Sequence, residues 1–160
     1  MIKLHIAESY HYNTNQIVYH GSDTKVDAKD FDTNRIPCFF SSYKEYSASY
    51  GSIVNAYRLN IQNPFILDNQ TTVSIYNNEF IPYAKSKGWT TNWPENIKSV
   101  NIGDKINFVV VDYLYPFLRR MKRKGIYNYD GIICSEGNNY YDDSYVPLDS
   151  SQISNAIDIE

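Results

Sequence analysis

Three groups of residues in this chain have types suited to chemistry: His20 and Gly21, then Ser47 and Tyr50, then Glu136, Asp142 and Asp143. A carboxylate can stabilise a developing positive charge or take a proton from a nucleophile. A glycine lets a ligand approach the backbone closely, because it has no side chain. Taken one at a time, each group also has an ordinary explanation, such as a turn with a hydrogen-bonded histidine or a solvated acidic hairpin. Their order along the chain therefore carries more information than any single residue.

Short strands and one short helix are expected to position the first two groups. The apolar run 16–19 predicts a strand that stops at a turn over 20–23, and residues 38–40 predict a second strand. A helix of about two turns is expected to end at Tyr50, with Gly51 as its left-handed stop. The polar stretch 23–35 between the strands is predicted to be loop.

The rest of the chain predicts a mixed α+β architecture. Apolar residues recur at helical spacing over 106–124, where Pro116 is expected to kink the helix. The stretch 68–99 is predicted to be loop and short helix. Further strands are expected at 53–61, 65–67, 131–134, 145–148 and 153–157. The pattern is typical of an α+β domain with many short strands.

Length and composition limit the class of protein. A chain of 160 residues, 42% of them hydrophobic, predicts a single domain over residues 1–160. The lack of an 18-residue apolar run or a secretion signal at the start leads us to expect a cytoplasmic protein. Cys38 and Cys134 lie in apolar runs and are expected to be buried free thiols. The net charge of −3 disfavours a general nucleic-acid binder.

An ordered set of short motifs runs through most of the chain. Its members are Tyr19-His20-Gly21-Ser22, Phe39-Phe40-Ser41-Ser42, Tyr46–Gly51, Ala56–Leu59, Asn63–Asp68, Tyr129–Ile133 and Tyr145–Asp149. The order and spacing resemble the ADP-ribosyltransferase superfamily of the His-Tyr-Glu type. The chain is most similar to small bacterial and phage-encoded members, which occur alone or inside large polyvalent phage proteins. The resemblance covers residues 17–157, apart from an insert over 68–105.

The resemblance implies a fold of short strands in two packed sheets with a few helices, and an enzyme that consumes NAD and needs no metal. It implies that His20 hydrogen-bonds a ribose hydroxyl of the adenosine half of NAD, and that the Gly21 backbone binds the nicotinamide amide. Ser47 would add a hydroxyl to that amide, and Tyr50 would stack on the ring. The expected binding set is His20, Gly21, Ser22, Phe39, Phe40, Ser41, Ser47 and Tyr50. Phe39 falls where the superfamily often has a tyrosine. For Ser47, a small residue that packs against the strand is an equally good interpretation.

The third motif residue departs from the superfamily pattern. Ser144 stands where relatives have the catalytic glutamate. Glu136 is ranked first as a replacement acid, Asp143 second and Asp142 third, so the expected catalytic set is Glu136, Asp143 and His20. Relatives without the motif glutamate tend to transfer a single ADP-ribose unit or to have lost activity.

Three functions therefore remain open at this point. The leading one is an NAD-dependent mono-ADP-ribosyltransferase, a phage effector or toxin-like protein, that modifies a macromolecular target, most naturally a protein, in a bacterial cytoplasm. The first alternative is an inactive binding module with the same fold. The second is a nucleic-acid-directed enzyme that holds a phosphate backbone with Arg119, Arg120 and Arg123. A basic last helical turn is more often a solvated helix end, which disfavours this last alternative.

Overall fold

The computed structural model describes residues 16–34, 36–88, 97–135 and 143–156 of the chain. All described strands belong to one sheet with the order β4-β6-β7-β2-β1-β3-β8, and β5 pairs with β6. The strands are β1 (Ile17–Ser22), β2 (Phe40–Ser41), β3 (Ile53–Leu59), β4 (Pro64–Phe65), β5 (Ile106–Asn107), β6 (Gly131–Ser135), β7 (Asp143–Pro147) and β8 (Ile153–Asn155). Pairing is antiparallel except where β4 and β5 meet β6.

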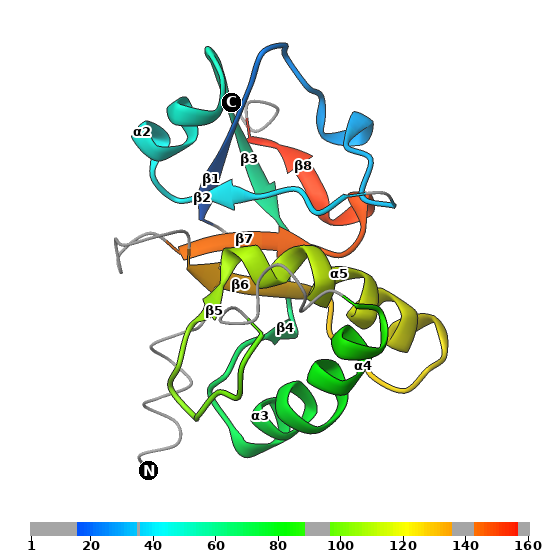
Figure 1. Ribbon diagram of the computed structural model, residues 1–160. Helices are drawn as coiled ribbons and strands as arrows, with labels where there is room; N and C mark the ends of the chain where they lie inside the picture. The colour runs from blue at the N-terminus through cyan, green and yellow to red at the C-terminus, as the bar shows by residue number, and fades with distance from the viewer. Residues whose placement is uncertain (1–15, 35, 89–96, 136–142, 157–160) are drawn as a thin grey trace.

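A short pairing between β2 and β7 connects two groups of strands into this one sheet. Only two residue pairs form the junction, Phe40 with Tyr145 and Ser41 with Ser144. Figure 1 shows β1, β3 and β8 on one side of β7, and β4, β5 and β6 with the longer helices on the other side. The expected α+β class is confirmed, whereas the two packed sheets are not, since the described strands form one sheet. The pairing of β2 with β7 hydrogen-bonds the backbone groups of two strands that would otherwise be sheet edges.

The strands β6 and β7 are buried on both faces, so they contribute to two hydrophobic cores. Ile132 and Val146 face the larger core, which the long helix α5 (Phe108–Arg123) covers with Val110, Leu114 and other apolar side chains. Their neighbours Ile133 and Tyr145 face the smaller core around Phe40 and Tyr57. Strand side chains alternate between faces, which explains why 131–134 is a continuous apolar run rather than an alternating one.

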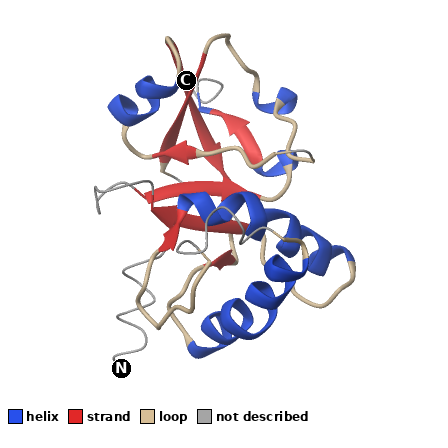
Figure 2. Ribbon diagram, viewed as in Figure 1, coloured by secondary structure: helices blue, strands red, loops and turns tan. Residues whose placement is uncertain are grey.

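The stretch 68–99, expected to be loop and short helix, is mostly helical in its described part. It contains α3 (Gln70–Ile75), a π-helical turn (Tyr76–Phe80) and α4 (Ile81–Ser86). The Asn69 side chain accepts a hydrogen bond from the Thr72 backbone N–H at 3.0 Å and begins the first of these helices. Figure 2 shows these helices packed on the side of the molecule that carries α5. Sequence reasoning underestimated this helical segment because its β-branched residues, asparagines and Pro82 have low helix propensity.

The β1 strand is longer than expected, and this changes the setting of His20 and Gly21. It continues through Ser22 and pairs with β3 along its whole length, with His20 opposite Asn55. It pairs with β2 at Tyr19 and Ser41. The two residues expected in a turn therefore lie in a strand, just beyond the point where its pairing with β2 ends.

The short helix that follows β2 packs closely against the end of β1. It consists of α2 (Lys44–Ser47) and a 3₁₀ turn (Ala48–Tyr50). Gly51 ends it with φ 173° and ψ 161°, so the expected left-handed stop is wrong. A Cβ on Gly51 would lie 2.4 Å from the Ser22 carbonyl oxygen, so this close backbone approach, rather than helix capping, requires glycine.

Two further expectations concern the thiols and membrane association. Cys38 and Cys134 are both buried and neither forms a disulfide, as predicted. Among the described helices, none has the length and apolar character needed to cross a bilayer.

Candidate active site

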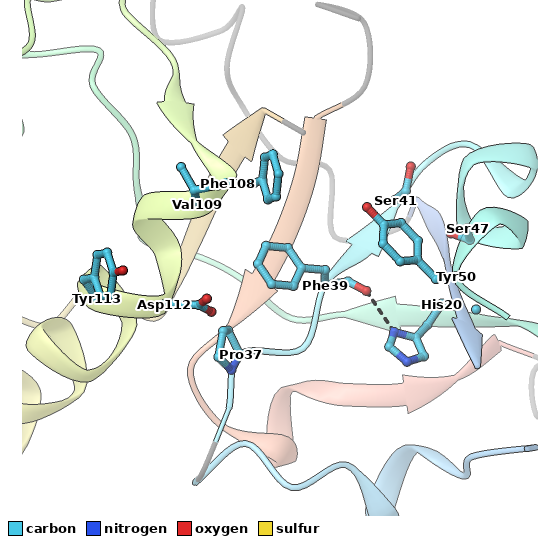
Figure 3. A pocket seen from close by; sticks show the side chains of 11 residues that line it. His20, Pro37, Phe39, Ser41, Ser47, Tyr50, Phe108, Val109, Asp112 and Tyr113 are labelled. Atoms are coloured by element: carbon cyan, nitrogen blue, oxygen red, sulfur yellow. Dashed lines mark hydrogen bonds between the residues drawn. The ribbon is translucent and has the colours of Figure 1, made fainter. Parts of the chain in front are cut away.

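A cavity of about 540 Å³ opens between the end of β1, the start of β2, the short helix and the N-terminal half of α5 (Figure 3). This volume is within the range of small-molecule binding sites. The residues that line it are His20, Gly21, Pro37, Phe39, Ser41, Ser47, Tyr50, Phe108, Val109, Asp112 and Tyr113. Six of the eight residues of the expected binding set lie together on its wall.

The His20 ring is held in one orientation by a hydrogen bond to the backbone of Phe39 and by contacts with two aromatic rings. Its Nδ1 lies 2.9 Å from the Phe39 carbonyl oxygen, and its ring packs against Phe31 and Phe40 at centroid distances of 5.0 and 5.3 Å. Because a carbonyl only accepts, Nδ1 carries the proton and Nε2 is the acceptor of the neutral ring. Burial lowers the pKa of His20 and outweighs the opposing effect of the Phe39 hydrogen bond. A neutral imidazole in this position can accept a hydrogen bond from a hydroxyl group.

Ser47 and Gly21 join the short helix to β1. The Ser47 hydroxyl donates to the Tyr19 carbonyl oxygen at 3.0 Å, and its side chain is buried. A Cβ on Gly21 would lie 1.8 Å from the Ser47 carbonyl oxygen. Glycine is thus required here by packing within the chain itself. Ser47 packs on the strand and also lines the cavity, so both interpretations of this residue fit, and its hydroxyl oxygen can still accept a hydrogen bond.

Aromatic rings face the cavity from two elements. Tyr50 is 56% exposed and presents its ring from the short helix, beside Ser41 in Figure 3. Phe39 extends its ring from the start of β2 toward α5. The Ser41 hydroxyl oxygen accepts a hydrogen bond from the Tyr43 backbone N–H at 3.1 Å. An exposed ring beside a cavity suits stacking on a flat ligand.

Two members of the expected binding set lie elsewhere. Phe40 is completely buried in the smaller core, and it contacts the cavity indirectly through the His20 ring. Strand alternation directs it away from Phe39 and Ser41, which line the cavity. The Ser22 hydroxyl donates to the Thr24 carbonyl oxygen in the turn after β1.

The predicted acids are separated by the structure. Ser144 is fully buried and pairs with Ser41, which lines the cavity. Asp143 does not line the cavity; it lies on the opposite face of β7 and forms an ion pair with Lys105 at 3.1 Å. Glu136 and Asp142 lie outside the described residues.

The wall formed by α5 was missed by the sequence analysis. Four cavity residues, Phe108, Val109, Asp112 and Tyr113, lie in its first two turns. Burial raises the pKa of Asp112 above its ordinary value. A signal was available, because Asp112 is the one acid in the segment 106–124.

The basic end of α5 has a structural role at Arg119. Its guanidinium donates to the Thr33 carbonyl oxygen at 2.8 Å and to the Asn34 side-chain oxygen at 2.7 Å. These bonds attach α5 to the loop that follows β1. Arg119 is therefore engaged within the chain, and the geometry gives no support to the alternative in which it would hold a phosphate backbone.

The arrangement suits a ligand with a flat polar ring and hydroxyl groups. The Gly21 backbone, the Ser47 hydroxyl and the Tyr50 ring surround one end of the cavity, and His20 offers an acceptor nitrogen beside them. In the part of the chain that the structure describes, no group of three or more His, Cys, Asp or Glu residues could hold a metal ion.

The comparison with protein families agrees with the motif pattern. A family model described as ADP-ribosyltransferase in polyvalent proteins matches residues 14–159. No curated protein matches the chain. A solved structure described as an anti-CRISPR protein aligns with a TM-score of 0.44 and 14% sequence identity, over 86% of this chain and 93% of that chain.

Proposed function

The chain belongs to the family of ADP-ribosyltransferases in polyvalent proteins, and from this premise we propose that it transfers a single ADP-ribose unit from NAD to a macromolecular target. The observation that carries the proposal is the cavity in which His20, Gly21, Ser47 and Tyr50 meet. We further propose that the target is a bacterial protein and that the chain acts in the bacterial cytoplasm as a phage effector or toxin-like protein.

The reaction breaks the bond between the ribose C1′ atom and the nicotinamide nitrogen of NAD. The bonding electrons pass to the nicotinamide ring, which becomes neutral and leaves. A nucleophile of the target bonds to C1′ and loses its proton to a carboxylate. The Gly21 backbone and the Ser47 hydroxyl would hold the nicotinamide amide, and the Tyr50 ring would stack on the nicotinamide ring. His20 would accept a hydrogen bond from a ribose hydroxyl. Each group fixes the substrate in a reactive geometry.

Two substitutions test the binding site. Loss of the stacking ring in Tyr50→Ala or of the ribose hydrogen bond in His20→Ala should each cost on the order of 1–3 kcal/mol, which corresponds to about tenfold or more in NAD affinity. Isothermal titration calorimetry measures both. Tyr43→Ala is the matched control, because Tyr43 is an exposed tyrosine that does not line the cavity. Unchanged affinity in both site variants, with the fold intact, would overturn the site assignment.

The size of the product tests the type of transfer. Because Ser144 replaces the glutamate that chain-elongating relatives use to activate an acceptor ribose, a modified target should carry single ADP-ribose units. The purified protein is incubated with labelled NAD and a bacterial lysate, and modified proteins are analysed by gel and mass spectrometry. One mass increment per acceptor site is expected. A ladder of polymer would contradict the proposal and would show that another carboxylate supports elongation.

The alternative function is a module with the same fold that binds NAD without turning it over, and the position of Ser144 favours it. Ser144 is buried beside Ser41, so the motif position offers a hydroxyl and no charge to the reacting centre. Such a module would bind NAD at the same cavity and leave it intact. Release of nicotinamide by the wild-type protein separates the two functions, since only the enzyme produces it.

A further inference from the structure

The side of the cavity formed by α5 lies apart from the groups that would bind NAD. Those groups come from β1 and the short helix, whereas Phe108 and Asp112 come from α5. In Figure 3 the Phe39 ring lies between Tyr50 and Asp112. With the nucleotide held by β1 and the short helix, the α5 side of the cavity is left for a second reactant.

The Asp112 carboxylate gives the α5 side of the cavity a negative charge. Among the described residues that line the cavity, none is a lysine or arginine. NAD carries a diphosphate, which a carboxylate repels, so this side disfavours the nucleotide and favours a cation. In the part of the chain that the structure describes, Asp112 forms no ion pair; the pair found there joins Lys105 to Asp143. Its charge is therefore available to a ligand.

Aromatic rings lie beside this carboxylate. Phe108 precedes Asp112 by one helical turn, so both side chains extend from the same side of α5. In Figure 3 the Asp112 carboxylate points toward the Phe39 ring. A guanidinium group is planar, pairs with a carboxylate through two N–H groups and stacks on aromatic faces, whereas an ammonium group is a compact and strongly hydrated charge. The α5 side therefore suits an arginine side chain better than a lysine side chain.

We propose that the α5 side of the cavity is the acceptor subsite, in which Asp112 binds the guanidinium group of a target arginine beside the rings of Phe39 and Phe108. The inference rests on the proposed function of the cavity and names the side chain that is modified. Asp112 and Phe108 are both exposed, which fits a reactant that a second protein presents from outside.

Transfer to arginine balances without a further reactant. The bond between C1′ and the nicotinamide nitrogen breaks, and its electrons go to the leaving nicotinamide. A guanidinium nitrogen forms a bond to C1′ and loses one proton, so the modified arginine keeps its single positive charge. The proton passes to the Asp112 carboxylate, which is hydrogen-bonded to the guanidinium, and from there to water. Burial raises the pKa of Asp112, so this carboxylate accepts a proton more readily than a fully hydrated one does.

Residue mapping in a bacterial lysate tests which side chain is modified. Lysate and NAD are incubated with the wild-type protein, Asp112→Asn or Asp30→Asn, and modified peptides are sequenced by mass spectrometry. The wild type should modify arginine. Asp112→Asn should reduce the amount of modified arginine at least about tenfold and change NAD affinity, measured by calorimetry, less than about threefold. Asp30→Asn is the matched control, since Asp30 is an exposed acid outside the cavity, and it should behave as the wild type does.

Binding of small cations tests the subsite without turnover. The probes are 1-propylguanidine and n-butylamine, which carry the same charge, and each is titrated into the NAD-free protein while its amide NMR signals are recorded. We expect 1-propylguanidine to shift signals of α5 and of the start of β2. It should bind the wild type at least about fivefold more tightly than it binds Asp112→Asn, and more tightly than n-butylamine does.

The outcomes separate this inference from the proposed function. ADP-ribose on a side chain other than arginine, equal binding of the two cations, or wild-type levels of modified arginine with Asp112→Asn would each overturn the acceptor subsite and leave the transferase proposal standing. A loss of about tenfold in NAD affinity in Asp112→Asn would also overturn it and would place Asp112 at the nucleotide. If the wild-type protein releases no nicotinamide from NAD, the proposed function fails and this inference fails with it.

Discussion

Gly21→Ala should destabilise the protein by more than about 3 kcal/mol and abolish measurable NAD binding, because the new Cβ would lie 1.8 Å from the Ser47 carbonyl oxygen. The new Cβ would belong to the backbone of β1 and would collide with backbone atoms of the short helix, so no flexible side chain can move away to relieve the collision. Relief requires the short helix to shift from β1, which breaks the hydrogen bond from the Ser47 hydroxyl to the Tyr19 carbonyl oxygen. It also moves Tyr50, one turn further on. Chemical denaturation and calorimetry measure the two effects.

Gly125→Ala is the matched control for this substitution. Gly125 has φ 73°, and a Cβ added there would meet no heavy atom within 4 Å, so the same change adds left-handed strain without a collision. That strain costs about 1–2 kcal/mol. If Gly21→Ala were no less stable than Gly125→Ala and bound NAD normally, the close packing of the short helix on β1 would be refuted.

Glu136→Gln should lower turnover by roughly two orders of magnitude with little change in NAD affinity, as expected when a carboxylate acts in the transition state. Glu136 follows β6 directly in sequence, and this strand pairs Cys134 with Ser144, the position that lacks the motif glutamate. The substitution keeps the shape of the side chain and removes its charge. Initial rates of nicotinamide release, with calorimetry on the same preparation, separate turnover from binding.

Asp143→Asn is the informative comparison for the acid. It removes a partly exposed ion pair with Lys105, which is worth about 0–1 kcal/mol, and Asp143 lies on the face of β7 opposite Ser144. We expect a small effect on turnover. Full turnover in Glu136→Gln combined with its loss in Asp143→Asn would reverse the ranking of the acids and leave the enzyme proposal intact.

Local patterns in the sequence predicted the parts of the site that lie within single segments. The strand and the short helix were identifiable, because turn residues and periodicity act over a few positions. The motif residues on them were identified through the resemblance to the superfamily. Strand alternation determines which of the remaining residues reach the site. It directs Phe40 into the core and leaves Phe39 and Ser41 at the cavity. Gly51 and Gly21 were recognised as special, yet the reason at both lies in a backbone segment distant in sequence.

The α5 wall could not be predicted from local patterns. Its apolar spacing correctly indicated a helix packed on a core, and Val110 and Leu114 are completely buried there. The position of α5 opposite the start of β2 depends on the pairing of β2 with β7, and these strands lie about a hundred positions apart in the sequence. The same junction replaced the expected two sheets by one. Two backbone pairs in short strands leave too weak a sequence signal to forecast such a connection.

Transfer itself is tested most directly with NAD that carries one label in the nicotinamide and another in the adenylate phosphate. The purified protein and a bacterial lysate are incubated with this NAD, and free nicotinamide and protein-bound adenylate label are counted, with Tyr50→Ala as the control of reduced binding. We predict that one adenylate label becomes protein-bound for each nicotinamide released, and that both counts fall in Tyr50→Ala. Nicotinamide release without protein-bound label, or no release from any lysate, would contradict ADP-ribosyl transfer by this chain.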